Sequence, residues 1–473
     1  MMKKIAFYNI SMIFLLFISA CKNEKPVSQD VQATGEEETL KPIEIADNAH
    51  YFQKENGDPF FWLGDTAWLM FTKLDRKEIA NYLDDRKEKG FNVIQVMLLH
   101  SLDAVSSYGD SALTDGQLDK PIVTEGNSLE KEAAYDYWDH MAYAIDLAEE
   151  KGLYMALVPV WGGNVNSGKV SVEQAEVYGK FLTERFKNEN IIWLNGGDTF
   201  GNEYTDVWNA LGSTIKKGSP NKLETFHPRG RHQSSDWFQN EDWLDFNMFQ
   251  SGHRRYDQDD SEKGYGEDNW KYVNVDYNLK PTKPTLDGEP SYEGIPQGLH
   301  DTLQPLWNAN DVRRYGYWSV FAGAAGYTYG HSAIMQFYTK EDGAGAYGNT
   351  INWQKALNAP GAEQMQYLKN LMMLFPYFAR VPDQDLIVNQ GEKYDYLAAT
   401  RGEDYAMIYT YTGKSIKVKM GKITGEEVDA FWYDPKDGSD LPIDSFKNVG
   451  IHEFDPPGEP EDGNDWVLVL TSK

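Results

Sequence analysis

Eight short apolar segments, each followed by a helix-forming stretch, dominate the sequence between residues 58 and 380. The segments are nearly uninterrupted hydrophobic runs, which is typical of parallel strands buried on both faces. Repeated strand–helix units favour a (β/α)8 TIM barrel, and a doubly wound sheet is the alternative. The barrel is preferred because no Gly-x-Gly-x-x-Gly sequence follows the first expected strand. The expected strands are residues 60–63, 91–99, 153–160, 191–194, 222–226, 244–249, 284–286 and 326–329.

Helical periodicity separates these strands. In residues 131–152, apolar side chains recur at spacings of four and three, which is one face of an amphipathic helix, and a glycine ends the stretch. The other expected helices are residues 75–90, 171–187, 206–217, 268–279, 312–324 and 362–375.

The pattern changes after about residue 383. Residues 405–410, 416–420, 428–433 and 466–470 have strand character and are separated by turns rich in Gly, Asp and Pro. The sequence therefore predicts a catalytic-type barrel over residues 45–382 and a small all-β sandwich over residues 383–473.

The first residues have the features of an export signal. Two lysines precede an apolar stretch at residues 10–20, and Cys21, the only cysteine, follows it. This arrangement resembles a bacterial lipobox, and an ordinary secretory signal is the alternative. We expect residues 1–21 to be a lipoprotein signal peptide and residues 22–44 a flexible tether, with export and a lipid anchor in the outer membrane through Cys21. A single cysteine excludes an intramolecular disulfide.

The chain is strongly acidic, with 45 basic and 73 acidic residues and a formal charge of −28. Nucleic acid, itself a polyanion, would be repelled by this average field, so we exclude it as a partner. The average charge still allows a local basic pocket for a carboxylated substrate. The 14 Trp and 29 Tyr residues suit stacking on sugars and equally suit a large core.

Polar or aromatic residues stand at the carboxyl ends of all eight expected strands. In barrels of this type the active site lies at that end. One such residue is most often a loop cap, but eight at the same end favour a binding site. These candidates are Asp65, His100, Trp161, Asn195 with Asp198, His227, Gln250 with His253, Glu289, and His331.

Two of these candidates, Asp198 and Glu289, end the fourth and seventh strands, which face each other across a barrel mouth. Glycosidic cleavage needs one protonated and one ionised carboxyl group on either side of the sugar carbon. A retaining enzyme places them about 5–5.5 Å apart, and an inverting enzyme places them farther apart. Asp65 and Asp287 are rival carboxylates. We interpret Asp65 as a substrate-hydroxyl ligand or an anchor of the first loop, and Asp287 as a support behind the site.

Four segments carry a family resemblance. PFFWLGDTAW at residues 59–68, RKEKGFNVIQ at 86–95, NGGD at 195–198 and DGEP at 287–290 resemble the apiosidase-like catalytic domain of glycoside hydrolase family 140. The resemblance covers about residues 45–380. The tail, with FWYDP at 431–435, is similar to a β domain of the collagen-binding type, a label that we do not take as its function.

The resemblance implies a retaining endo-apiosidase that cleaves the apiose–galacturonic acid bond in the pectin rhamnogalacturonan II. It makes Asp198 the general acid/base and Glu289 the nucleophile. An Asp stands where the wider clan commonly has Glu, so the acid is one methylene shorter. Gly196 and Gly197 would allow a backbone turn that aims Asp198 inward, or would make room for a neighbouring aromatic ring.

Other assignments are less specific. Tyr327 and Tyr329 are candidates to position Glu289, and the cationic or titratable side chains near the mouth are candidates to bind a uronate carboxylate. These are His227, Arg229, His253 and Arg254. No metal or cofactor is expected. Two alternative functions stay open: a retaining glycosidase acting on another plant glycan, because loops choose the substrate, and a non-catalytic glycan-binding lipoprotein on the cell surface.

Overall fold

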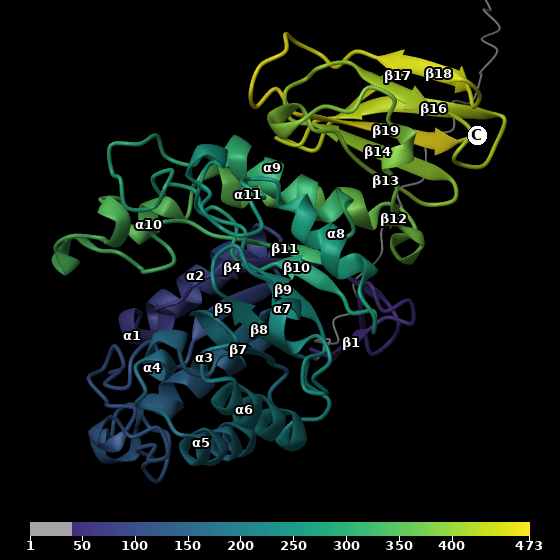
Figure 1. The fold of residues 1–473 in the computed structure, drawn as a ribbon. Coiled ribbons are helices and arrows are strands. Elements are labelled where there is room, and N and C mark those ends of the chain that lie inside the picture. The colour runs from purple at the N-terminus through teal and green to yellow at the C-terminus, as the bar shows by residue number, and fades with distance from the viewer. Residues whose placement is uncertain (1–39) are drawn as a thin grey trace, which may run out of the picture. The chain divides into compact units, whose positions relative to one another are not determined.

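The structure, a computed structural model, describes residues 40–473 (Figure 1). The predictions on residues 1–39, including the signal peptide and lipidation of Cys21, lie outside the described residues. Within residues 40–473 the structure contains no helix that is long and apolar enough to cross a membrane.

Eight parallel strands form one sheet in the order β8-β7-β6-β5-β4-β11-β10-β9. The pairing of β11 with β4 joins the last strand to the first, and Asp245 N–H donates to Glu224 O over 2.8 Å between β9 and β8. The predicted (β/α)8 barrel is confirmed. The strands are β4 (Trp62–Thr66), β5 (Val93–Met97), β6 (Tyr154–Val158), β7 (Ile192–Thr199), β8 (Glu224–Pro228), β9 (Asn247–Phe249), β10 (Thr285–Asp287) and β11 (Gly326–Tyr329).

Helices cover the outside of this sheet (Figure 1). The helix expected from residue 131 begins only at residue 137, because the Asp136 side chain accepts hydrogen bonds from the N–H groups of Trp138 and Asp139 and caps the helix there. The fifth unit has only the short α7. The helices are α1 (Met70–Lys73), α2 (Arg76–Glu88), α3 (Tyr137–Glu150), α4 (Gly162–Asn166), α5 (Val172–Arg185), α6 (Thr205–Gly218), α7 (Ser235–Phe238), α8 (Trp270–Asn278), α9 (Ala309–Phe321), α10 (Trp353–Ala356) and α11 (Pro360–Met373).

A small antiparallel sheet precedes the barrel. It consists of β1 (Ile43–Ile45), β2 (Phe52–Lys54) and β3 (Pro59–Phe60). Strand β1 includes residues 43 and 44 of the segment, residues 22–44, that was expected to be a tether. The Phe52 ring packs edge-on against Phe246 with centroids 5.2 Å apart and also contacts Trp62. Since Phe246 directly precedes β9, these rings fill the amino-terminal end of the barrel.

The carboxyl-terminal part is all-β. A six-stranded antiparallel sheet runs β12-β13-β14-β19-β16-β17, and β15 pairs with β18. Ile416 and Val418 of the pair pack with Ile408, Trp432 and Leu468 of the large sheet in one buried cluster. The strands are β12 (Val381–Pro382), β13 (Ala398–Arg401), β14 (Tyr405–Thr410), β15 (Ile416–Lys419), β16 (Glu427–Tyr433), β17 (Asp440–Lys447), β18 (Ile451–Phe454) and β19 (Trp466–Ser472). The predicted β domain is confirmed.

Helix α9 contacts both the barrel and the β domain. Arg313 Nε and Nη2 donate to the two carboxylate oxygens of Asp465 over 2.8 and 2.7 Å, and both side chains are buried. Tyr317 stacks on Tyr409 with ring centroids 4.7 Å apart. The buried Arg313–Asp465 pair therefore joins the helix of the seventh unit to the segment that precedes β19.

Removing one partner of this pair should destabilise the protein. We expect Asp465→Ala to lower the free energy of unfolding by about 3–5 kcal/mol, because an unpaired guanidinium would remain buried. The exposed Asp444→Ala serves as the control and should change it by less than about 0.5 kcal/mol. Urea denaturation compares the two variants, and equal midpoints would contradict this role of the pair.

Candidate active site

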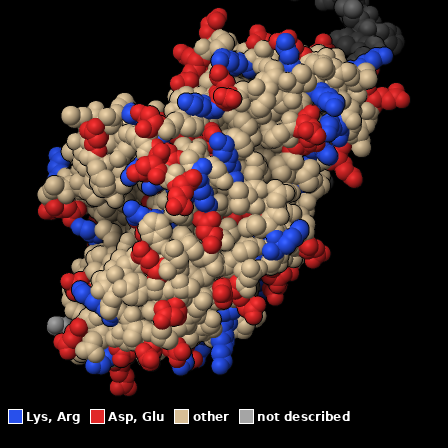
Figure 2. Space-filling model, viewed as in Figure 1, with Lys and Arg blue, Asp and Glu red and all other residues tan. Residues whose placement is uncertain are grey.

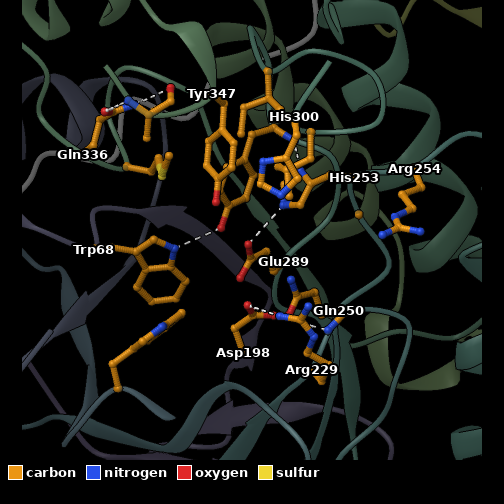
Figure 3. A pocket seen from close by; sticks show the side chains of 18 of the residues that line it. Trp68, Asp198, Arg229, Gln250, His253, Arg254, Glu289, His300, Gln336 and Tyr347 are labelled. Carbon is orange, nitrogen blue, oxygen red and sulfur yellow. Dashed lines mark hydrogen bonds and ion pairs between the residues drawn. The ribbon is translucent and has the colours of Figure 1, made fainter. Parts of the chain in front are cut away.

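A cavity of about 320 Å³ opens at the carboxyl ends of the barrel strands. Asp198, at the end of β7, and Glu289, two residues after β10, both line it. Figure 3 shows their carboxyl groups next to each other inside the cavity. The two acidic residues that are far apart in the chain thus meet at one mouth of the barrel.

The end of β7 has an irregular backbone. Gly196, Gly197 and Asp198 all have positive φ angles, of 88°, 108° and 47°, and the register with β8 shifts between Gly196 and Thr199. The predicted loop is therefore a bulge inside a longer strand. Because the left-handed backbone here departs from the pleat, the Asp198 side chain points into the cavity.

The two glycines also leave space for their neighbours. A Cβ atom on Gly196 would lie 2.7 Å from His227 O, and one on Gly197 would lie 2.5 Å from the Trp161 ring. Both interpretations of these glycines apply, because the backbone turn and the close approach of an aromatic ring occur together.

Two histidines hold the Glu289 carboxylate. His253 Nε2 lies 3.1 Å from Oε1 and His227 Nε2 lies 3.2 Å from Oε2. In each ring Nδ1 faces a backbone N–H, that of Tyr292 in the first case and that of Asp198 in the second, so Nε2 is the nitrogen that faces Glu289. Burial would raise the pKa of Glu289, but these histidines outweigh it and lower the pKa to about 2. Glu289 is therefore ionised.

The pKa of the second carboxyl group, that of Asp198, is shifted in the opposite direction. Burial and the adjacent Glu289 charge raise the pKa of Asp198 above its ordinary value, although Arg229 opposes this shift. Arg229 Nη1 donates to Asp198 Oδ2 over 2.6 Å, and the Gly230 N–H donates to Oδ1 over 3.4 Å. One ionised carboxylate beside one acid that keeps its proton to higher pH is the pairing required for acid and nucleophilic catalysis.

Asp287 supports the site from behind. It is buried at the end of β10, where it accepts hydrogen bonds from Ser251 Oγ and Asn269 Nδ2 over 2.5 and 3.1 Å. Burial raises its pKa to about 7. Gln95 Nε2 donates to Gly288 O over 2.9 Å and fixes the next peptide. These bonds hold the backbone that leads to Glu289.

Several predicted residues lie together at the cavity. Trp161, Arg229, Gln250, His253 and Arg254 line it with the two carboxyl groups, and His227 contacts Glu289 from behind. The buried Gln250 Oε1 has no hydrogen-bond partner among the described residues. It is therefore an acceptor available to a sugar hydroxyl.

Asp65 and Asn195 do not reach the cavity. Asp65 is fully buried and accepts hydrogen bonds of 2.6 Å from both Tyr82 and Arg86 on α2, so the prediction of a substrate ligand is wrong and the alternative of an anchor describes it. Asn195 Nδ2 donates to Trp208 O on α6 over 3.0 Å. Both side chains face the surrounding helices.

Tyr327 and Tyr329, which were predicted to position Glu289, bind other residues. Tyr329 OH donates to Glu293 Oε2 over 2.7 Å, and Tyr327 OH donates to Val312 O over 3.3 Å. Neither positions Glu289, because these side chains point away from the cavity.

His331 and His100 lie outside the cavity lining as well. His331 Nδ1 accepts the Ala333 N–H over 3.0 Å, and burial lowers the pKa of its ring to about 3. His100 is half-buried, with its Nε2 atom 3.3 Å from Ser101 Oγ. Neither side chain lines this cavity, and the substrate-binding role of both stays a prediction.

The structure adds residues that the sequence analysis missed. Trp68 and Tyr292 line the cavity, and Trp68 Nε1 donates to the Tyr292 hydroxyl over 3.2 Å. Trp68 ends the segment of residues 59–68 that carries the family resemblance, so the sequence did contain a signal for it. Tyr347 points toward the carboxyl pair from the long loop after β11 (Figure 3), and no periodicity marks it. The ring centroids of Trp68 and Trp161 lie 5.4 Å apart, and the two rings provide apolar faces for a sugar.

The part of the chain that the structure describes has no cluster of three His, Cys, Asp or Glu side chains arranged to hold a metal ion.

Comparisons with known proteins relate both parts of the chain to described families. Residues 46–379 match the family model described as the apiosidase-like catalytic domain, and residues 381–471 match that of a collagen-binding domain of a collagenase. A solved structure described as a glycoside hydrolase is 47% identical, with 92% of this chain and 97% of that chain covered and a TM-score of 0.86. A glycoside hydrolase family 5 structure from Bacteroides vulgatus ATCC 8482 is 43% identical, with 91% and 93% covered and a TM-score of 0.85. No curated protein matches the chain.

The β7 bulge gives a prediction on stability. Gly197→Ala should lower the free energy of unfolding by roughly 2–4 kcal/mol, through the positive φ and the contact with Trp161. Gly163→Ala is the matched control, because nothing lies within 4 Å of its added Cβ and alanine favours the helix α4. Thermal unfolding distinguishes them, and equal stability of the two variants would mean that the bulge tolerates a side chain.

Proposed function

The chain belongs to the apiosidase-like family of glycoside hydrolases, and we propose that it is a retaining endo-apiosidase. Its proposed reaction is cleavage of the bond between apiose and galacturonic acid in rhamnogalacturonan II. The observation that carries the mechanism is the pair of neighbouring carboxyl groups whose pKa values are shifted in opposite directions. A protein that only binds glycans would not need two carboxyl groups with pKa values shifted in opposite directions.

In the first step, the ionised Glu289 attacks the anomeric carbon and forms a glycosyl ester while the bond to the leaving oxygen breaks. Asp198 gives its proton to that oxygen, so the departing sugar leaves as a neutral alcohol. The hydrogen bond from His253 and the close contact of His227 hold one face of the nucleophile.

In the second step, Asp198, now ionised, takes a proton from a water molecule. The water oxygen attacks the anomeric carbon, the ester bond to Glu289 breaks, and the carboxylate of Glu289 is restored. Two inversions give net retention at the anomeric carbon. The same residue thus acts as acid in the first step and as base in the second.

Three features of the cavity support a pectic substrate. Trp68 and Trp161 offer aromatic faces to a sugar ring, and Gln250 offers a free acceptor to a hydroxyl. Arg229 and Arg254 bring guanidinium N–H donors to the mouth of an otherwise acidic protein, and such donors suit the carboxylate of a uronic acid.

The test uses purified rhamnogalacturonan II side-chain oligosaccharides and identifies the released sugars. Wild-type protein should release a fragment with apiose at its new reducing end. Asp198→Asn and Glu289→Gln should each reduce kcat by about 10³-fold or more, because each removes a group that acts in the transition state. Activity on other glycans alone would replace the substrate assignment, and full activity of both variants would end the assignment of these roles.

Azide separates the two roles. With a substrate that has a good leaving group, azide should restore turnover of Asp198→Ala with retention, because it attacks the glycosyl ester in place of water. It should restore turnover of Glu289→Ala with inversion, because it enters the space of the missing nucleophile. Nuclear magnetic resonance of the glycosyl azide reads the configuration, and the same configuration from both variants would contradict the assignment.

The pH profile gives an independent prediction. Activity requires protonated Asp198, so kcat/KM should fall as pH rises through the pKa of this group. Arg229 lowers that pKa, and Arg229→Gln should therefore move the alkaline limb to higher pH. The control is Arg255→Gln, since Arg255 pairs with Asp257 outside the cavity. An unchanged limb in Arg229→Gln would show that another group controls it.

We also propose that the protein is exported and anchored to the bacterial outer membrane through a lipid on Cys21. The support is the sequence: lysines, an apolar stretch and then the only cysteine of the chain. An anchor at this position would hold the barrel where large glycans from outside the cell are encountered.

A further inference from the structure

A second cavity adjoins the first. Its volume is about 670 Å³, and it shares Arg229, Gly230, Arg231 and Arg254 with the cavity that holds the carboxyl pair. These shared residues form the wall between the two spaces. The second cavity is therefore adjacent to the one that holds the catalytic carboxyl groups.

Aromatic side chains line the second cavity. His232 and Trp237 stack with ring centroids 5.2 Å apart, and the Phe200 ring meets His232 edge-on at 5.1 Å. All three rings are half-buried, so each leaves part of its surface exposed. Such a surface suits the apolar face of a sugar ring.

Most of the cations in the second cavity already have carboxylate partners. Lys263 Nζ donates to Asp236 over 2.8 Å, Arg254 Nη1 donates to Asp260 over 2.5 Å, and Arg229 donates to Asp198. Across the face shown in Figure 2, acidic and basic side chains are likewise interspersed. These cations therefore lie close to carboxylates, and the length of each contact distinguishes them.

Arg231 has the longest carboxylate contact of these cations. Its Nη1 donates to Gly252 O over 3.1 Å, and the nearest carboxylate contact, to Asp259, is 3.9 Å from Nε. Its side chain is 13% exposed, so the remaining guanidinium N–H groups have little access to water. Burial and the adjacent Arg254 charge both lower the pKa of Arg231, and an anion between the two arginines would relieve this repulsion.

The backbone fixes Arg231 in place. Its φ angle is +66°, a region that is uncommon for residues other than glycine. Its N–H donates to Gln250 O over 2.6 Å, which connects it to a strand-end residue of the first cavity. A constrained backbone of this kind is a feature of functional sites.

We propose that the second cavity is a sugar subsite for a uronic acid residue, with the Arg231 guanidinium binding the carboxylate beside Arg254 and Trp237 stacking on the ring. This rests on the proposed function, because it extends the same pectic chain beyond the cleaved bond. Arginine suits this role because its planar fork pairs with both oxygens of a carboxylate.

Calorimetric binding of trigalacturonate and of its fully methyl-esterified form tests the proposal. The titrations use Glu289→Gln, which prevents hydrolysis and leaves the second cavity intact. The charged probe should bind at least about 10-fold more tightly than the neutral ester, because a charge-assisted pair contributes energy of that order. No turnover is needed, so a failure of the endo-apiosidase proposal is measured separately by the release of sugars.

Second substitutions in this background separate charge from stacking. Arg231→Gln should weaken trigalacturonate about 10-fold and leave the ester unchanged, with Arg231→Lys intermediate because it retains charge and loses the fork. Trp237→Ala should weaken both probes. Arg255→Gln is the matched control, since this neighbouring arginine lines neither cavity, and it should change neither affinity.

Three results would overturn the proposal: no binding of trigalacturonate, equal affinity for acid and ester, or equal effects of Arg231→Gln and Arg255→Gln. Thermal unfolding of each variant shows whether it is folded. If Trp237→Ala unfolds, the comparison of Arg231→Gln with Arg231→Lys still decides the matter.

Discussion

The His227 ring connects the two halves of the active site. Its Nδ1 atom accepts the Asp198 N–H over 3.3 Å, and its Nε2 atom faces Glu289 Oε2 at 3.2 Å. One side chain from β8 thus ties the β7 bulge to the carboxylate that follows β10. The Asp198 backbone N–H thus helps to orient the ring that faces the nucleophile.

Separation of the two carboxyl pKa values depends on unequal surroundings in one cavity. Both groups are buried, and burial favours the protonated form of each. Two histidines reverse this effect at Glu289, whereas the single Arg229 does not reverse it at Asp198. The ionised Glu289 then raises the pKa of Asp198 further. The protonation of one residue is therefore set partly by the charge of the other.

The β domain is connected to this site through α9. Asp465 holds Arg313 at one side of the helix. Tyr315, two residues later, contacts Ser291 through its hydroxyl over 3.2 Å, and Ser291 follows the Glu289 segment closely. We infer that the domain stabilises the loop of the seventh unit by packing, a role that requires no ligand of its own.

The sequence by itself determined the barrel, the β domain and the two acidic strand ends, because short apolar runs and turn residues act locally. It could not decide which strand-end side chains face the cavity. Asp65, Asn195 and Tyr329 are polar residues at the same end, yet the first two bind helix residues and Tyr329 binds Glu293 in the loop after β10. A strand buried on both faces shows no alternation in its sequence that would reveal this direction.

Only the tertiary structure decided the rest. It turned Asp198 inward through the bulge, set two histidines on Glu289, and placed Arg231 between two cavities. Each depends on contacts between segments distant in the chain, whose distances and burial fix the charges that residue type alone leaves open.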